Sequence, residues 1–147
     1  AGTFPLPEAQ LDRFLLYIKV SYPSLEEELS ILSNTTGSKK EKVTSVMSGD
    51  DIIALQSLVR EVHISHDIIS MVGHMVRNTR PIDSKSAFVK EWVRWGAGPR
   101  AGQAMILTAK ARALIHGRYA VTFEDIQQVA YPVLRHRVLM NFKAEAE

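Results

Sequence analysis

The sequence predicts an all-α protein, a compact bundle of about five helices preceded by an N-terminal strap with one short strand. Three observations predict this fold class. Apolar residues recur at helical spacing through most of the chain after residue 24, and capping residues precede several of these stripes. A single strand-like run, at 15–20, has no convincing partner strand in the sequence. We therefore expect a strap at residues 1–23 and a helical domain at residues 24–147.

Within the strap, Pro7 is suited to the first position of a short helix over residues 7–14. The apolar and β-branched run from Leu15 to Val20 is typical of a buried strand. A strand that cannot pair within the chain is the first indication that its sheet lies in a part of the protein outside this sequence. Tyr22-Pro23 ends the segment.

Ser24 and Glu27 have the spacing of a capping box, and Leu25, Leu29 and Leu32 then fall on one helical face. A polar loop is expected over residues 33–42. The next helix is expected to be capped by Asp50 or Asp51, because an apolar stripe at helical spacing follows: Ile52, Leu55, Leu58, Val59 and Val62. Ser65 is expected to cap the helix after it, whose apolar stripe is Ile68, Ile69, Val72, Met75 and Val76.

The sharp break at 96–99 precedes a long alanine-rich helix over about 99–116, which Gly117 ends. Thr122 begins the next helix, with Asp125 in the capping-box position. Because proline is disfavoured inside a helix, Pro132 is expected to start a further short helix that continues to about residue 139.

The composition excludes several classes of protein. With 147 residues, 46% hydrophobic and 23% charged, the chain is ordinary for one globular domain, and wholesale disorder is excluded. No cysteine is present, which excludes disulfide frameworks, thiolate catalysis and cysteine-ligated zinc, and fits a cytoplasmic protein. No apolar run approaches the roughly 18 residues of a membrane span, and no signal peptide is visible. We expect no metal site, because the five histidines have no cysteine partners, and His63 and His66, three residues apart, lie across a predicted loop and helix start.

Charge is distributed unevenly along the chain. The net charge is only +2, but residues 1–75 carry 6 basic and 10 acidic residues, and residues 76–147 carry 12 basic and 6 acidic ones. A basic second half suggests contact with phosphate or with an acidic partner.

Arg100 is the most informative single residue. It lies in the first turn of the predicted helix at 99–116, where a cation opposes the helix dipole by about 0.3–1 kcal/mol. A bound anion would explain this placement, because a helix N-terminus and an arginine both attract phosphate. A surface arginine that pairs with an acidic neighbour explains it equally well. Arg13 follows a short helix and is compatible with its dipole, so by itself it carries little information.

Three motifs taken together resemble one family, the MoxR-type AAA+ ATPases. Residues 2–14 resemble the stretch after the sensor 1 asparagine, Gly96-Ala97-Gly98-Pro99-Arg100-Ala101 resembles the sensor 2 motif, and Val133-Leu134-Arg135-His136-Arg137 resembles the motif that closes the lid. The motifs occur in the family's order over nearly the whole chain. The family usually has serine where Gly98 stands, and its loss removes a possible N-cap hydroxyl.

The resemblance implies roles for these residues. Arg13 matches the arginine finger, which reaches the γ-phosphate bound by the adjacent subunit of a ring. Arg100 matches the sensor 2 arginine, which with Gly98 and Pro99 faces phosphate bound by its own subunit. Such arginines neutralise the charge on the transferred phosphoryl group. His136 and Arg137 also match family positions, and we interpret them as a structural histidine and an ion-paired arginine.

The resemblance also implies a domain division, cofactors and partners for the protein. Residues 1–23 would be the last part of the AAA+ core, and residues 24–147 its lid. ATP and Mg²⁺ would bind in the full-length protein and not tightly to this fragment, which without the Walker motifs should not hydrolyse ATP alone. The expected partners are the core, the neighbouring subunits of a ring, expected to be a hexamer, and von Willebrand factor A domain proteins. The expected task is chaperone-like remodelling or metal loading.

One alternative from another class is a basic helical module that binds nucleic acid. The arginines of the second half favour it: Arg77, Arg80, Arg94, Arg100, Arg112 and Arg118. Against it, no recognition-helix motif is visible, and the long helix carries only Lys110 and Arg112 near its middle.

Overall fold

A computed structural model describes residues 4, 6–38 and 43–145 of the chain. These residues are mostly helical, which confirms the predicted fold class. The elements in chain order are α1 (Glu8–Leu11), α2 (Leu25–Thr35), α3 (Gly49–Glu61), α4 (His66–Asn78), α5 (Ala87–Trp92), β1 (Val93–Trp95), α6 (Pro99–Ile115), α7 (Phe123–Leu134), β2 (Leu139–Met140) and α8 (Phe142–Glu145).

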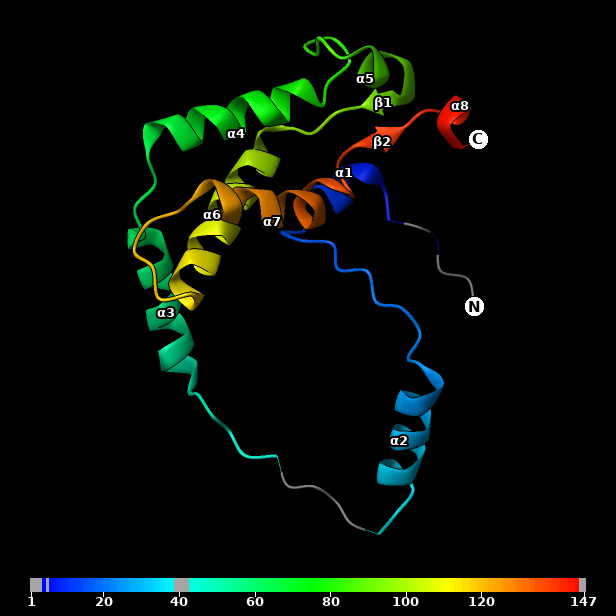
Figure 1. Cartoon of the computed structure of the whole chain (residues 1–147), viewed down its shortest axis with the longest axis vertical. Coiled ribbons are helices and arrows are strands. Elements are labelled where there is room, and N and C mark those ends of the chain that lie inside the picture. The colour runs from blue at the N-terminus through cyan, green and yellow to red at the C-terminus, as the bar shows by residue number, and fades with distance from the viewer. Residues whose placement is uncertain (1–3, 5, 39–42, 146–147) are drawn as a thin grey trace.

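Helix α6 is the centre of the packed part of the structure, and α3, α4 and α7 lie against it (Figure 1). Most of its inward side chains are small, since Ala101, Ala109 and Ala113 are fully buried. The larger Met105 is fully buried as well. Small side chains let neighbouring helices approach closely, so this alanine-rich sequence becomes the helix on which the others pack. Val72 of α4 and Ile126 of α7 complete the core.

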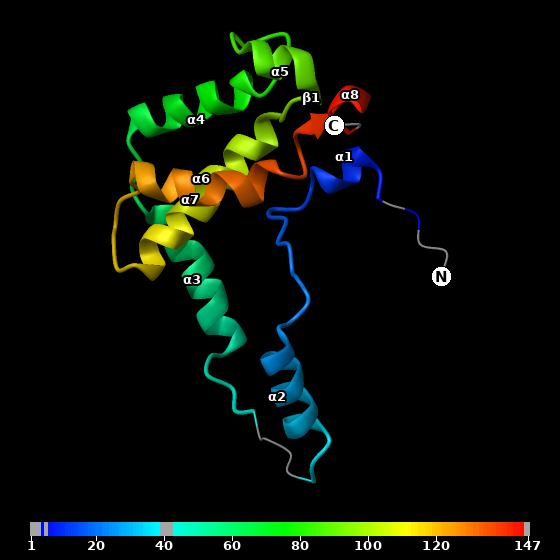
Figure 2. The ribbon, with the colours of Figure 1, turned by 45° about the vertical axis from the view of Figure 1, so that its right-hand side comes forward.

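Helix α2 lies outside this core. Figures 1 and 2 show it well apart from α4, α6 and α7, joined to them through extended segments. None of its residues is buried, and its apolar face, with Leu25, Leu29 and Leu32, is more than half exposed. The predicted capping box is present, with the Ser24 hydroxyl accepting from the Glu27 amide and the Glu27 carboxylate accepting from the Ser24 amide. Local sequence therefore makes this helix without any support from the core.

The strand expected at 15–20 is not formed. These residues belong to no strand ladder, and their one hydrogen bond between backbone groups to another described part of the chain runs from the Tyr17 amide to the Pro132 carbonyl, at 2.9 Å. The strands of the described residues lie elsewhere: β1 and β2 pair antiparallel, with Val93 opposite Met140 and Trp95 opposite Leu139. An extended segment is a strand only where a partner supplies a ladder, and here none does.

Several helix boundaries differ from the expectation for local reasons. The first helix covers only Glu8–Leu11, with Pro7 as its N-cap. Ser48, and not an aspartate, caps α3, while Asp51 fills the third helical position of a capping box. Pro132 starts no further helix, because it lies within the last turn of α7. There it removes only one helical hydrogen bond, and the buried side chains of Val129 and Val133 hold the turn in place.

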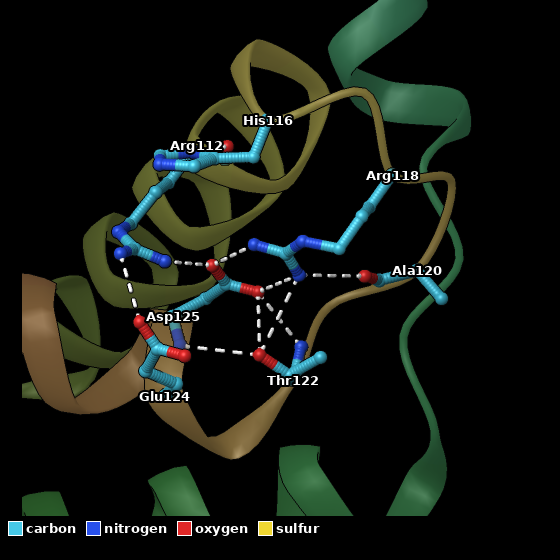
Figure 3. Close-up of polar contacts among 7 residues, drawn as sticks. All are labelled: Arg112, His116, Arg118, Ala120, Thr122, Glu124 and Asp125. Atoms are coloured by element: carbon cyan, nitrogen blue, oxygen red, sulfur yellow. Dashed lines mark hydrogen bonds and ion pairs between the residues drawn. The ribbon is translucent and has the colours of Figure 1, made fainter.

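A buried ion cluster fixes the connection between α6 and α7 (Figure 3). Asp125 is fully buried and accepts from Arg112 Nη1 at 2.5 Å and from Arg118 Nη1 and Nη2 at 2.7 and 2.6 Å. It also closes the predicted capping box with Thr122. The Arg118 guanidinium, with help from Thr122 and Arg112, holds the pKa of Asp125 well below its usual range. Asp125 thus serves both as a helix cap and as a counter-ion for two arginines.

Among the described residues, no helix is both long and apolar enough to cross a membrane.

Replacing Asp125 by Asn is expected to destabilise the protein by about 3 kcal/mol or more, because it leaves Arg112 and Arg118 without their buried counter-ion while an acceptor for Thr122 remains. Glu124 contacts only Arg112 and is two-thirds exposed, so Glu124→Gln should cost less than about 1 kcal/mol. Urea unfolding at pH 7, followed by circular dichroism, measures both values. Equal losses in the two variants would contradict this account of the cluster.

Candidate functional site

The two arginines singled out from the sequence line one pocket. It has a volume of about 200 Å³ and lies between the end of α1, the N-terminal half of α6 and the residues that follow α7. We call it the arginine pocket, and its lining residues are Asp12, Arg13, Leu15, Arg100, Gln103, Ala104, Leu107 and Arg137. Three guanidinium groups and a single carboxylate make its lining positive, and it is large enough for a phosphoryl group.

The loop before α6 is fixed by tight packing against the end of α4. A Cβ atom on Gly96 would lie 2.4 Å from the Thr79 carbonyl oxygen, so only glycine fits there. The Ala97 amide donates to Thr79 Oγ1 at 2.8 Å, and Arg80 Nε donates to the Ala97 carbonyl at 2.9 Å. These contacts set the place at which α6 begins, and thereby the place of Arg100.

Arg100 lies in the first turn of α6, after the N-cap Gly98 and the first helical residue Pro99. No side chain caps this helix, so its N-terminus remains open to an anion. The Arg100 side chain is 56% exposed, and its Nη1 lies 3.3 Å from Asp12 Oδ2. Both interpretations made from the sequence thus find support, because an acidic neighbour is present and the guanidinium still lines a positive pocket.

Arg13 lies just beyond α1, and its amide donates to the Gln10 carbonyl. Its side chain is exposed and has no hydrogen bond or ion pair among the residues that the structure describes. The structure therefore brings Arg13 and Arg100 together across 87 positions of sequence, with Gly98 and Pro99 at the adjacent helix end.

Arg137 and His136 attach the strap to the end of α7. The Arg137 side chain is 2% exposed, and its Nε donates to Asp12 Oδ1 at 3.1 Å. His136 Nε2 lies 3.1 Å from the Phe14 carbonyl oxygen, and its ring stacks on Tyr17. The expectation of a structural histidine and an ion-paired arginine agrees with these contacts. Their partners, residues 12–17, could not be predicted from the sequence, because nothing in the motif at 133–137 points to them.

Burial lowers the pKa of His136, and the positive charge of Arg137 acts in the same direction. The Phe14 carbonyl and Asp12 oppose this shift but do not cancel it. The neutral ring can donate from Nε2 to the Phe14 carbonyl, which leaves Nδ1 buried with no partner among the described residues. Protonation of Nδ1 would bury an unsatisfied donor beside a guanidinium, so the fold favours the neutral ring.

The second half of the chain matches a known family model. Residues 85–147 match the model described as the AAA lid domain. The chain is also similar to a crystal structure of a protein from Cytophaga hutchinsonii, described as a candidate ATPase, with a TM-score of 0.91 and 33% sequence identity. That match covers 99% of this chain and 45% of the other.

Two curated relatives are similar over 99% of the chain. It is 38% identical over 147 residues to chaperone MoxR1 of Mycobacterium tuberculosis, and 38% identical over 147 residues to the uncharacterized protein YeaC of Bacillus subtilis. The chain spans 39% of the length of the first relative and 43% of the second.

Lowering the pH from 7.5 to 5.5 is expected to destabilise the wild type more than the His136→Gln variant. The pKa of His136 is lower in the folded chain than the usual 6.5, so below about pH 6.5 the unfolded state binds the extra proton. The free energy of unfolding then falls by at most about 1.4 kcal/mol per pH unit from this group. Urea unfolding across this range measures the slopes, and parallel slopes in the two proteins would refute the assignment.

Proposed function

We propose that the chain acts as the lid region of an ATPase of the MoxR type. Two similarities support this proposal: residues 85–147 match the AAA lid domain model, and almost the whole chain is similar to chaperone MoxR1. In this proposal, ATP is bound and hydrolysed by a nucleotide-binding core. The lid contributes phosphate contacts and couples hydrolysis to the chaperone-like remodelling or metal loading of partner proteins.

The observation that carries the proposal is the convergence of Arg13 and Arg100 on the arginine pocket. Arginine is suited to neutralising a transferred phosphoryl group, because its planar guanidinium donates two parallel hydrogen bonds to phosphate oxygens. The open N-terminus of α6, at Gly98 and Pro99, adds a second element that favours an anion. We therefore assign Arg13 the role of arginine finger, and Arg100 with this helix end the role of sensor 2.

The shared pocket bears on which nucleotide the two arginines contact. The family resemblance places Arg13 on the phosphate of the adjacent subunit and Arg100 on that of its own subunit. Both side chains line one pocket of a single chain, which favours contact with the same phosphate. We therefore propose that the sensor 2 arginine, Arg100, contacts the phosphate bound by the adjacent subunit together with Arg13, and not the phosphate of its own subunit that the family resemblance implies.

The residues present fit the phosphate groups of ATP but not the metal. Within the described part of the chain, no group of three or more histidine or acidic side chains could hold an ion. Mg²⁺, which would neutralise phosphate charge, is therefore proposed to be held by the core. This chain's own residues orient the phosphate and stabilise the charge that develops on it.

We propose that residues 1–23 are the last part of the nucleotide-binding core in the sequence, with residues 12–17 attached to the helices that follow, and that residues 24–147 form the lid. The exposed apolar side chains support this division, since Ile18, Val20 and Tyr22 are 75%, 86% and 94% exposed and call for a covering surface. The proposed assembly is a hexameric ring, and the proposed clients include von Willebrand factor A domain proteins, both from the family resemblance.

A nucleic-acid-binding function is less well supported, because the basic half of the chain is not a free cationic surface. Arg77 and Arg80 pair with Asp83, and Arg112 and Arg118 pair with Asp125. Backbone binding to nucleic acid needs arginines and lysines that are available to neutralise phosphates. Five of the six arginines that favour this alternative, Arg100 with Asp12 included, are therefore engaged in ion pairs within the fold.

Arg13→Ala, in a protein that joins this chain to its core, is expected to lower kcat for ATP about 10³-fold. Mixing this variant with a Walker-dead protein should restore activity, because the Walker-dead subunit supplies an intact Arg13 to its neighbour. Arg100→Ala should lose activity and be restored in the same way, since we propose the same phosphate for both residues.

Arg94→Ala serves as the matched control, because Arg94 is an exposed arginine outside the arginine pocket. Its kcat should stay within about twofold of the wild type, as expected for a surface substitution away from the site. An unchanged kcat in Arg13→Ala would contradict the finger role. Lost activity that no mixing ratio restores would contradict action across the subunit interface.

A further inference from the structure

The guanidinium of Arg137 has a contact pattern that the proposed function does not use. This residue lies just after α7, and its side chain is almost completely buried. Nη2 donates to the Asp12 carbonyl at 3.0 Å and to the Phe14 carbonyl at 2.5 Å. These two carbonyl groups belong to the residues on either side of Arg13. One buried nitrogen atom, Nη2 of Arg137, therefore binds the backbone on both sides of the proposed arginine finger.

The remaining donors of Arg137 complete the attachment. Nη1 donates to the Leu15 carbonyl at 3.3 Å and to the Val133 carbonyl, in the last turn of α7, at 2.7 Å. Nε donates to the carboxylate of Asp12, whose other oxygen contacts Arg100. A buried guanidinium is stable only when its donors are satisfied, and here most of its acceptors come from residues 12–15.

The attachment is local and ends at Tyr17. Apart from the contacts of Arg137 and His136, the described part of the strap has one more hydrogen bond to the α7 region, which the Tyr17 amide donates to the Pro132 carbonyl. Within the described residues, no backbone hydrogen bond after Tyr17 joins the strap to the helices. Ile18 and Val20 are exposed, so the following segment is free of the lid. The fixed part of the strap is therefore the part that carries Arg13.

We propose that Arg137 is a positioning residue for Arg13, so that the arginine finger and the lid helices move as one body. This inference rests on the proposed function for its effect on catalysis, and on the geometry above for the attachment. Movement of the lid during the ATPase cycle would then carry Arg13 towards or away from the phosphate. Lysine cannot replace Arg137 in this role, because one ammonium group cannot reach the separate carbonyl groups and the carboxylate together.

Amide hydrogen exchange in the 147-residue chain tests the attachment without ATP. Arg137→Lys should speed exchange of the Tyr17 amide, and of the amides of residues 12–14, by at least about tenfold, because the strap opens more often. Arg135→Gln is the matched control, since Arg135 stacks on Tyr131 and has no hydrogen bond or ion pair with the described residues of the strap. Its exchange at residues 12–17 should equal that of the wild type.

ATPase kinetics in the protein joined to its core test the positioning role. Arg137→Lys should lower kcat about 10- to 100-fold while KM for ATP changes little, because a misplaced finger affects the transition state more than substrate binding. A merely structural role would not depend on Arg13. Adding Arg137→Lys to Arg13→Ala should therefore cause no more than about a twofold further loss.

Each result decides the inference. Exchange at residues 12–17 that is unchanged in Arg137→Lys overturns the attachment, whatever the ATPase rate. Faster exchange with an unchanged kcat, or additive losses in the double variant, overturns the positioning role. If Arg13→Ala itself leaves kcat unchanged, the proposed finger is wrong and the positioning role falls with it, while the exchange data still decide whether Arg137 attaches the strap.

Discussion

The need to satisfy one buried guanidinium shapes the functional end of this molecule. Arg137 follows directly on α7, where its side chain is enclosed by the core and cannot be hydrated. The carbonyl groups of residues 12–15 and the Asp12 carboxylate supply most of its acceptors. A segment whose apolar side chains are mostly exposed, with Leu16 packed against the hydrophobic core, is thereby held on the lid, and this attachment places Arg13 beside Arg100.

The rest of the fold provides a rigid base for this contact. The small side chains of α6 allow α4 and α7 to pack closely on it, and the Asp125 cluster fixes the turn between α6 and α7. Helix α6 begins at the arginine pocket, so the packing of α4 and α7 on its middle fixes the direction in which its N-terminus points. Asp12 therefore pairs with two arginines whose positions are fixed by the same packed helices: Arg100 at the start of α6 and Arg137 beyond the end of α7.

Local signals in the sequence predicted much of this structure. The capping boxes at Ser24 and Thr122 and the glycine stop at Gly117 depend on neighbouring residues only, and each is present. The strand expected at 15–20 required a partner, and the place of Pro132 depended on packing around α7, so both expectations were wrong. Arg13 and Arg100 could be selected from motifs, but their common pocket depends on a contact across more than 120 positions. No local pattern encodes such a contact, which is why the role of Arg137 was missed.

The central claim is that Arg13 and Arg100 form one phosphate site, and a titration of the 147-residue chain with inorganic pyrophosphate tests it directly. Nuclear magnetic resonance can follow the Nε–H signals of individual arginines. If both arginines bind the same phosphate, the signals of Arg13 and Arg100 shift along a single binding curve with one Kd, while the signal of Arg94, outside the pocket, does not respond. Signals that stay unmoved, or two curves with different Kd values, would contradict this claim.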